Sequence, residues 1–190
     1  MTHETVPHPI DLTASALVAV SRTALSSLRS SLLRDAGPAA AGYLQEAGYA
    51  GGEAVYEAFR TWLHERGYAV PESLGIEEFA AHASEYFHDL GWGSIRLGAF
   101  RDTVATLDSS DWGEADPAGG LDQPSCHLST GMFADFFGRI ADTPLAVMEV
   151  ECRSVGDSRC RFLLGSAEVM ERLYESMAAG KGYEAAVEAI

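Results

Sequence analysis

Residues 148–164, with the sequence MEVECRSVGDSRCRFLL, form two apolar-rich arms around a Gly-Asp turn. This pattern predicts a β-hairpin that carries one thiol on each arm. If the loop is centred on Gly156, Cys152 faces Cys160 across the hairpin, with Cβ atoms about 4.5–5.5 Å apart. Two thiolates in these positions can bind one metal ion.

The two arms alternate in polarity, as expected of a strand pair with one buried face. The other face carries Glu151 and three arginines. Glu149 has the parity of this charged face, so it can join Cys152 at a metal only if a bulge or a strand end turns it. We therefore predict an irregularity between residues 149 and 152. Six side chains share the face of the cysteines: Met148, Val150, Cys152, Cys160, Phe162 and Leu164.

A third thiol, Cys126, follows a proline and a serine at the start of an apolar-periodic segment that runs to Ile140. This arrangement predicts a helix with Cys126 in its first turn. Three thiolates and the carboxylate of Glu149 suit Zn²⁺ in a closed tetrahedral site. Such a site has no open position for a reacting water, so the zinc would be structural.

Two other interpretations of the cysteines remain open from spacing alone. Cysteine is among the most buried residue types, and all three can act as small hydrophobic side chains. Alternatively, Cys152 and Cys160 can form a disulfide, because directly opposed strand cysteines are near bridging distance. The odd cysteine count and the lack of a secretory signal favour a reducing compartment, so we expect a cytoplasmic protein without disulfides.

These residues resemble the 4-vinyl reductase domain family, which includes the sensory domains of phenol- and xylene-responsive transcription activators. The likeness extends over nearly the whole chain, and its most specific parts are 124–127 and 149–162. The resemblance implies a structural zinc held by the three cysteines and Glu149. It also implies a mixed α/β domain akin to the Golgi transport-particle (Bet3-like) subunits, commonly dimeric, with a ligand cavity between helices and sheet.

Composition favours a single folded domain. The chain has 190 residues, of which 47% are hydrophobic, enough for a substantial core. The formal net charge of −15 disfavours nucleic acid or an anionic membrane as a direct partner. Residues 1–10 are polar and contain prolines, so we expect a flexible N-terminal arm that is neither a signal peptide nor a membrane anchor, followed by one domain over 11–190.

The order of the predicted elements gives the fold class. Apolar periodicity predicts helices over 11–35, 39–47, 53–66 and 77–89, the second and third separated by glycines. Two strands are expected on either side of residues 101–102, followed by a polar loop over 108–123 that could be a functional lid. The fold is thus α+β: N-terminal helices, then an antiparallel sheet with one helix inserted before the C-terminal hairpin, and a last amphipathic helix from Ser166.

A ligand cavity in such a domain would be mostly apolar with a few polar groups. The position near Leu107 is a tryptophan in the phenol sensors, so we expect a ligand other than phenol. Each candidate can also be ordinary core, and a histidine on a helix flank commonly bonds a carbonyl or water. The resemblance suggests Leu107, Gly131, Phe137 and Val147 as lining positions, and we add His82 as a polar anchor and Trp92 as an aromatic contact.

The sequence contains no nucleophile elbow, P-loop, dinucleotide fingerprint or HExxH motif, and no catalytic residue is assigned. An enzyme interpretation therefore rests on the family name alone. We expect a zinc-stabilised module that binds small apolar or aromatic molecules as a stand-alone sensor or carrier, and that forms a homodimer through the N-terminal helix. The alternatives are an accessory protein of tetrapyrrole or bacteriochlorophyll synthesis and a non-catalytic dimeric scaffold.

Overall fold

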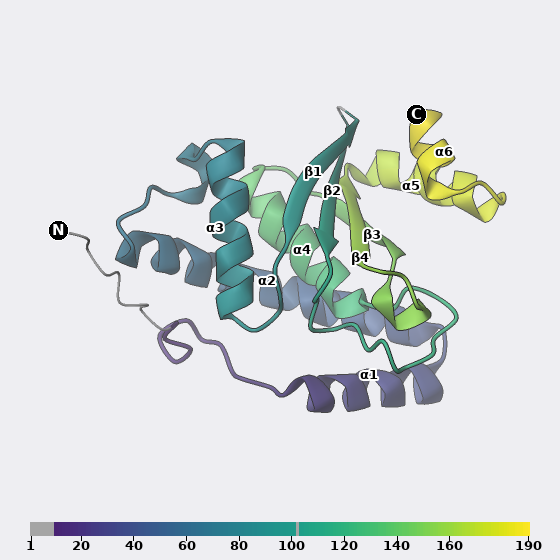
Figure 1. The fold of residues 1–190 in the computed structure, drawn as a ribbon, viewed down its shortest axis with the longest axis horizontal. Helices are drawn as coiled ribbons and strands as arrows, with labels where there is room; N and C mark the ends of the chain where they lie inside the picture. The colour runs from purple at the N-terminus through teal and green to yellow at the C-terminus, as the bar shows by residue number, and fades with distance from the viewer. Residues whose placement is uncertain (1–9, 102) are drawn as a thin grey trace.

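The computed structural model describes residues 10–101 and 103–190 (Figure 1). Helices precede an antiparallel sheet, and one helix lies between its two hairpins, so the predicted α+β class is confirmed. The elements, in chain order, are α1 (Arg22–Ala36), α2 (Ala39–Glu65), a short 3-10 helix (Pro71–Ser73), α3 (Ile76–Asp89), β1 (Arg96–Arg101), β2 (Val104–Ser109), α4 (His127–Ile140), β3 (Ala146–Glu151), a second 3-10 helix (Arg153–Val155), β4 (Cys160–Gly165), α5 (Ala167–Ala178) and α6 (Tyr183–Glu188).

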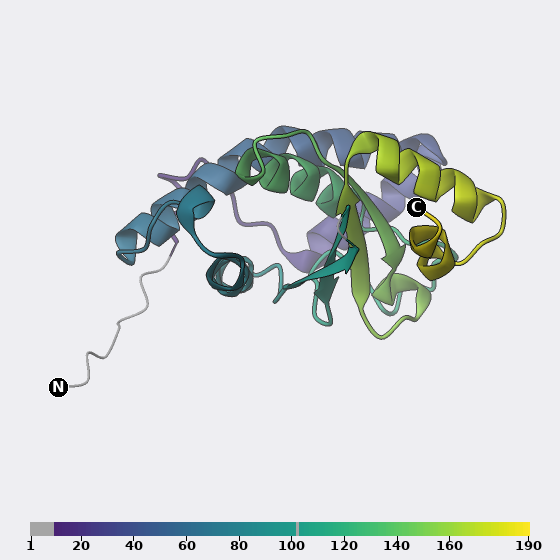
Figure 2. The ribbon, with the colours of Figure 1, turned by 90° about the horizontal axis from the view of Figure 1, so that it is seen from above.

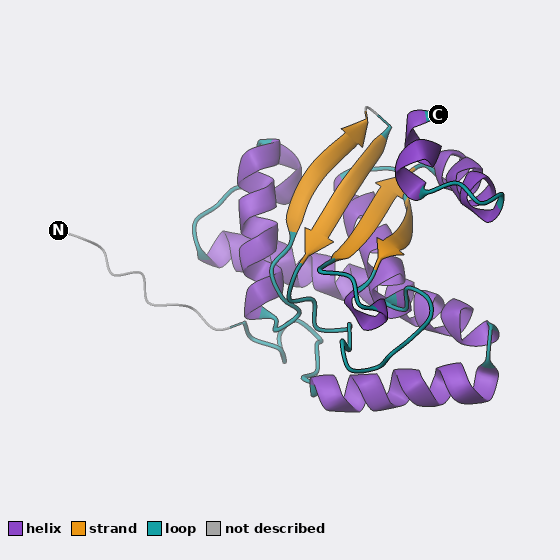
Figure 3. Ribbon diagram, turned by 45° about the vertical axis from the view of Figure 1, so that its right-hand side comes forward, coloured by secondary structure: helices purple, strands orange, loops and turns teal. Residues whose placement is uncertain are grey.

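The four strands are antiparallel in the order β1-β2-β4-β3, and helices cover both faces of the sheet (Figure 3). Alternation along each strand divides the side chains between the two faces. The face toward α2, α3 and α4 carries Leu97, Leu107, Val147, Phe162 and Leu164. The face toward α5 and α6 packs Val104 and Leu163 on Val169, Met170 and Leu173.

Helix α2 is continuous, so the predicted break into two helices at residues 48–52 is wrong. Gly48 and Gly52 are buried against α4, which runs beside α2 in Figure 2. A Cβ atom at Gly48 would overlap the carbonyl oxygen of Leu128, and one at Gly131 would overlap that of Gln45. Glycine costs a helix about 1 kcal/mol relative to alanine, but here it allows the two backbones to touch.

Helix α1 is shorter than predicted and begins at Arg22 rather than at residue 11. The hydroxyl oxygen of Ser21 accepts a hydrogen bond from Ala24 N at 3.2 Å and caps the helix. Asp11 accepts two backbone bonds in a preceding turn, at 3.0 Å each. Short polar side chains of this kind compete with helical hydrogen bonds and place the boundary. Of the arm predicted over 1–10, residues 1–9 lie outside the described residues.

The loop between β2 and α4 begins inside the core. Trp112 is fully buried, stacks on Trp92 with ring centroids 5.4 Å apart, and donates from Nε1 to Ser129 Oγ at 2.7 Å. Glu114 is also buried. This part of the loop is packed structure, which argues against the predicted role as a lid.

Over the described residues, no helix is both long and apolar enough to cross a membrane.

Candidate metal centre and apolar groove

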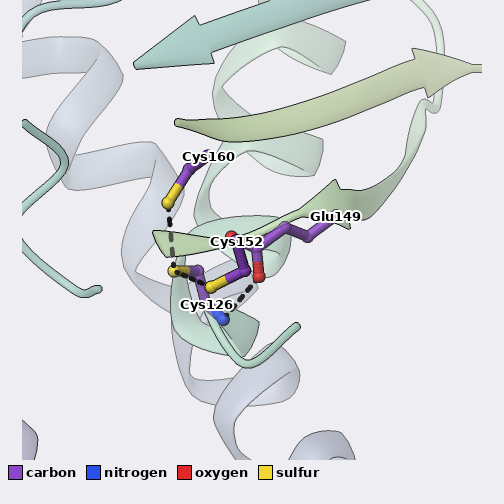
Figure 4. A group of neighbouring side chains, drawn as sticks. All are labelled: Cys126, Glu149, Cys152 and Cys160. Carbon is purple, nitrogen blue, oxygen red and sulfur yellow. Dashed lines mark hydrogen bonds between the residues drawn. The ribbon is translucent and has the colours of Figure 1, made fainter. Parts of the chain in front are cut away.

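The four side chains predicted to bind zinc lie together at the N-terminal end of α4 (Figure 4). One potential ligand atom from each of Cys126, Glu149, Cys152 and Cys160 lies within 4.8 Å of the others. Cys126 is the N-cap residue of α4, Glu149 lies in β3, and the other two cysteines flank the loop between β3 and β4. All three cysteines are fully buried.

The irregularity predicted between residues 149 and 152 is present. Glu149 pairs with Phe162, but Glu151 pairs with Arg161, so β3 carries one extra residue at Val150. The bulge changes the parity of the strand, which brings the carboxylate of Glu149 to the side of the thiols. Met148 and Val150 therefore pack on the face toward α5, and their predicted place on the face of the cysteines is wrong. Strand β3 then ends at Glu151, and the sulfur-bearing residue Cys152 starts a turn.

The distances between the sulfur atoms fit a tetrahedral metal. Cys126 Sγ lies 3.8 Å from Cys152 Sγ and 4.0 Å from Cys160 Sγ. Zinc–sulfur bonds of about 2.3 Å at tetrahedral angles place two sulfurs roughly 3.8 Å apart. A disulfide requires about 2.05 Å, and all three cysteines are free. The geometry therefore suits a shared cation and excludes a disulfide in this conformation.

One carboxylate oxygen of Glu149 has no hydrogen-bond partner among the described residues. Its Oε2 accepts a hydrogen bond from Cys126 N at 2.8 Å, whereas its Oε1 is buried and has no hydrogen-bond partner among the described residues. Burial raises the pKa of Glu149 to about 9. An unpaired buried carboxylate oxygen is costly, and coordination to a cation removes that cost.

The contacts among the thiols favour a thiolate at Cys152 and protons on Cys126 and Cys160. Hydrogen bonds from Cys126 and Cys160 lower the pKa of Cys152. The pKa of Cys126 is raised well above its ordinary value by its contacts with Cys152 and Cys160 and by burial. A divalent cation must displace these protons, so metal binding would release protons and weaken in acid.

One residue that bonds the start of α4 escapes sequence reasoning, namely Glu114. Its Oε1 accepts from Leu128 N at 3.1 Å, and its Oε2 accepts from Ser129 N at 2.8 Å and from the Ser129 hydroxyl. Burial raises the pKa of Glu114, and these bonds and the charge of Arg29 act in the opposite direction. An acidic residue in a polar loop, far from the helix it caps, gives no local signal.

A groove lies at the other end of α4, between the start of α3, the β1–β2 hairpin and the loop after α4. Its volume is about 910 Å³, within the range of small-molecule sites. Charged side chains at Glu72, Glu77 and Arg101 are part of its lining. The apolar lining includes Leu74, Phe79, Leu97, Ala105, Phe137 and Leu164.

The six predicted ligand contacts are dispersed, and Phe137 is the one that lines the groove. Gly131 lies at the crossing of α2 and α4, and Trp92 stacks on Trp112. Leu107 is fully buried and Val147 partly buried on the sheet face toward α4. His82 packs on the rings of Tyr68 and Trp62, with centroids 3.9 and 6.2 Å away. These residues serve packing here, and their contact with a ligand stays a prediction.

The groove and the thiol cluster are separated by the length of α4. The helix has 14 residues, which corresponds to about 21 Å at 1.5 Å per residue. Between the two ends lie Phe133 and Phe136, which pack on Phe87 with ring centroids 5.7 and 5.2 Å away. A metal at one end would thus fix the helix without touching a ligand at the other.

Two solved structures share this architecture, and a third is less similar. The phenol-responsive sensory domain of the transcription activator PoxR, solved with phenol, is 17% identical with a TM-score of 0.64, over 87% of this chain and 84% of that chain. A trafficking protein particle complex subunit 3 from Naegleria fowleri, covalently bound to palmitic acid, is 13% identical with a TM-score of 0.57, over 76% and 91%. A vinyl-4-reductase family protein from Methanocaldococcus jannaschii is 16% identical with a TM-score of 0.46, over 62% and 66%.

No curated protein sequence matches this chain. At such identities the first two structures show a common fold and no more. The family model of the 4-vinyl reductase domain matches residues 114–166, a stretch that begins at the capping residue Glu114 and includes all four side chains of the cluster. The resemblance to the 4-vinyl reductase domain family that the sequence predicts is thereby confirmed for this stretch.

Proposed function

We propose that this protein is a small-molecule-binding module in which the groove holds an apolar ligand and a structural zinc ion fixes the opposite end of α4. The groove carries the proposal, because it leaves about 910 Å³ open beside a core whose interior is filled by aromatic rings. The fold of the PoxR sensory domain, which was solved with phenol, supports a role in sensing. A carrier role uses the same cavity.

The zinc proposal rests on the chemistry of the donors. Three thiolates and one carboxylate are a tetrahedral donor set, and the unpartnered Glu149 Oε1 supplies the fourth ligand atom. When bound, the ion acts as a cross-link between α4 and the β3–β4 hairpin. With all four positions taken by protein atoms, no position is left for a substrate. Free thiols at such a site suit a reducing compartment such as the cytoplasm.

The size of the groove favours a ligand larger than one aromatic ring. A volume of 910 Å³ corresponds to roughly 30 water molecules at about 30 Å³ each. The related trafficking subunit holds palmitic acid covalently. In this chain all three cysteines belong to the metal cluster, so the groove offers no thiol and its ligand would bind without a covalent bond.

We also propose a homodimer as the form that passes on the ligand signal, because apolar side chains near α1 face solvent. Val18, Val20 and Leu28 are exposed by 83%, 63% and 57%. Burying such side chains against a second copy would be favourable. Sedimentation of the purified protein measures the subunit number directly, and a monomer at micromolar concentration contradicts this part.

Filling the groove tests the ligand site. Ala105 is exposed in β2 and lines the groove, so Ala105→Trp should reduce the affinity for 1-naphthol and for dodecanoic acid by more than 10-fold. Ala50→Trp, on an exposed position of α2, is the matched control and should bind as the wild type does. Isothermal titration measures both, and native mass spectrometry should show one zinc per chain in all three proteins. Saturable binding that is equal in both variants contradicts the groove.

A further inference from the structure

Helix α1 docks on the body of the protein through polar side chains. Arg22, Ser26 and Arg29 share one helix face at spacings of four and three residues. Arg22 Nη2 donates to Gly91 O at 2.6 Å, and Ser26 Oγ donates to Asp116 Oδ2 at 3.0 Å. Arg29 Nη1 donates to the backbone oxygen of Glu114. All of α1 is described, and Arg29 is its one buried residue.

Glu114 performs the capping that an N-cap side chain ordinarily performs. N-cap residues usually accept hydrogen bonds from the second and third helical N–H groups. The N-cap of α4 is Cys126, whose side chain makes no such bond and points to the other thiols. The two N–H groups, of Leu128 and Ser129, bond to Glu114 instead. Because Glu114 caps the helix, the sulfur of Cys126 remains available for a metal.

The side chain of Glu114 is buried but fully hydrogen-bonded. Ser129 Oγ accepts from Trp112 Nε1, so its own proton is available to Glu114. Both oxygens of Glu114 therefore receive hydrogen bonds, which favour its ionised form and act against the burial that raises its pKa. The guanidinium of Arg29, only 2% exposed, lies close enough to attract this charge. Replacing Arg29 would remove both its hydrogen bond to the backbone oxygen of Glu114 and a positive charge near that side chain.

We propose that Glu114 and Arg29 are positioning residues of the metal centre: Glu114 caps α4 in place of Cys126, and Arg29 holds Glu114 in place through its backbone oxygen, so that docking of α1 and binding of zinc support each other. The inference rests on the zinc site proposed above. By thermodynamic linkage, whatever α1 docking adds to zinc affinity, zinc must add to α1 docking. The strength of α1 docking would thereby depend on whether the metal site is occupied.

Zinc affinity and hydrogen exchange test this coupling on the full chain. Competition with a chelator should show affinity reduced about 10-fold in Glu114→Gln and in Arg29→Met, in the range of changes to partners behind metal ligands. The double variant should be no weaker than the weaker single variant, because the two residues act as a pair. Arg29→Lys keeps the charge and should recover part of the affinity. Arg22→Met removes a contact of α1 that does not involve Glu114, so its affinity should fall less than that of Arg29→Met.

Exchange of the α1 amides provides the reciprocal measurement. Zinc should slow their exchange in the wild-type protein and in Arg22→Met, and should have little effect in Arg29→Met. If the wild type binds zinc but Arg29→Met binds it equally well, or if zinc leaves α1 exchange unchanged, the coupling is wrong and the zinc site stands. If the wild type binds no zinc, both the site and the coupling are wrong. Should Glu114→Gln fail to fold, the Arg29 variants still decide.

Discussion

The N-terminal end of α4 has polar atoms that lack partners, whereas its C-terminal end has apolar surface that lacks neighbours. In the described part of the chain, the buried side-chain atoms without hydrogen bonds are Arg29 Nε, Ser125 Oγ and Glu149 Oε1. Glu149 belongs to the thiol cluster, Ser125 directly precedes Cys126, and Arg29 bonds the backbone of Glu114. At the other end Phe137 faces a groove of about 910 Å³. A cation would complete the first end, and an apolar molecule would complete the second.

On the functions proposed above, one helix would serve two kinds of binding at opposite ends without mixing them. The aromatic block around Phe133 and Phe136 is fully buried and separates the ends. A tightly packed block leaves little freedom for small displacements, so the groove can adapt to a ligand while the thiol cluster keeps its geometry. The two ends should therefore respond differently to the same type of perturbation.

Loss of a thiol should produce the largest effect, and it should be confined to the first end. Cys152→Ser should reduce zinc affinity by more than about 100-fold, since changes behind metal ligands alone cost about 10–100-fold. The midpoint of thermal unfolding should fall, because binding energy of the ion is folding energy. A chelator should lower the wild-type midpoint to that of the variant and leave the variant unchanged. Equal midpoints for wild type and variant without chelator would contradict a structural metal.

Removal of a phenyl ring should cost more in the middle of α4 than at the groove. Phe133 is fully buried among Trp112, Phe87 and Phe162, so Phe133→Ala should destabilise the fold by about 3–5 kcal/mol. Phe137→Ala should fall at or below the lower end of that range, because the space it leaves joins the groove. Urea unfolding measures both free energies. Equal costs would mean that the groove end is as tightly packed as the middle.

The smallest expected effect is a pH dependence at the rim of the groove. The hydroxyl of Tyr56 donates to Glu72, and burial followed by this contact raises the pKa of Tyr56 to about 12, from an ordinary value of 10.0. The folded state keeps the proton longer than the unfolded chain does. The stability from this group is thus fully present below pH 10 and is lost as pH rises toward 12.

Tyr56→Phe tests that contact. The variant should lose about 1 kcal/mol at neutral pH, typical of a hydrogen bond, and its unfolding free energy should vary less between pH 10 and 12. Phenolate absorbance follows the ionisation independently. An identical pH profile in wild type and variant would show that Tyr56 is not the group that titrates.

Local patterns allowed the thiol cluster to be predicted from the sequence. Alternation along the hairpin placed Cys152 and Cys160 on one face, and the parity of Glu149 indicated a bulge, which is present between 149 and 151. The fold class followed from the order of helical and strand periodicities. These patterns are properties of short segments, so they can be recognised without knowledge of the tertiary structure.

The features that the sequence did not reveal depend on contacts between distant segments. The glycines that seemed to end a helix at residue 48 are tolerated because α4 packs on them. The cap of α4 comes from Glu114, which is 13 residues before the helix starts at His127. The groove is lined by segments from 71 to 166, and no single segment carries a pattern for it.

The extra residue at Val150 has an evolutionary consequence. Deleting that one residue would straighten β3 and return Glu149 to the charged side of the hairpin, while every cysteine codon stayed intact. A descendant of this protein could thus lose the proposed metal site through a three-nucleotide deletion and still keep all three thiols.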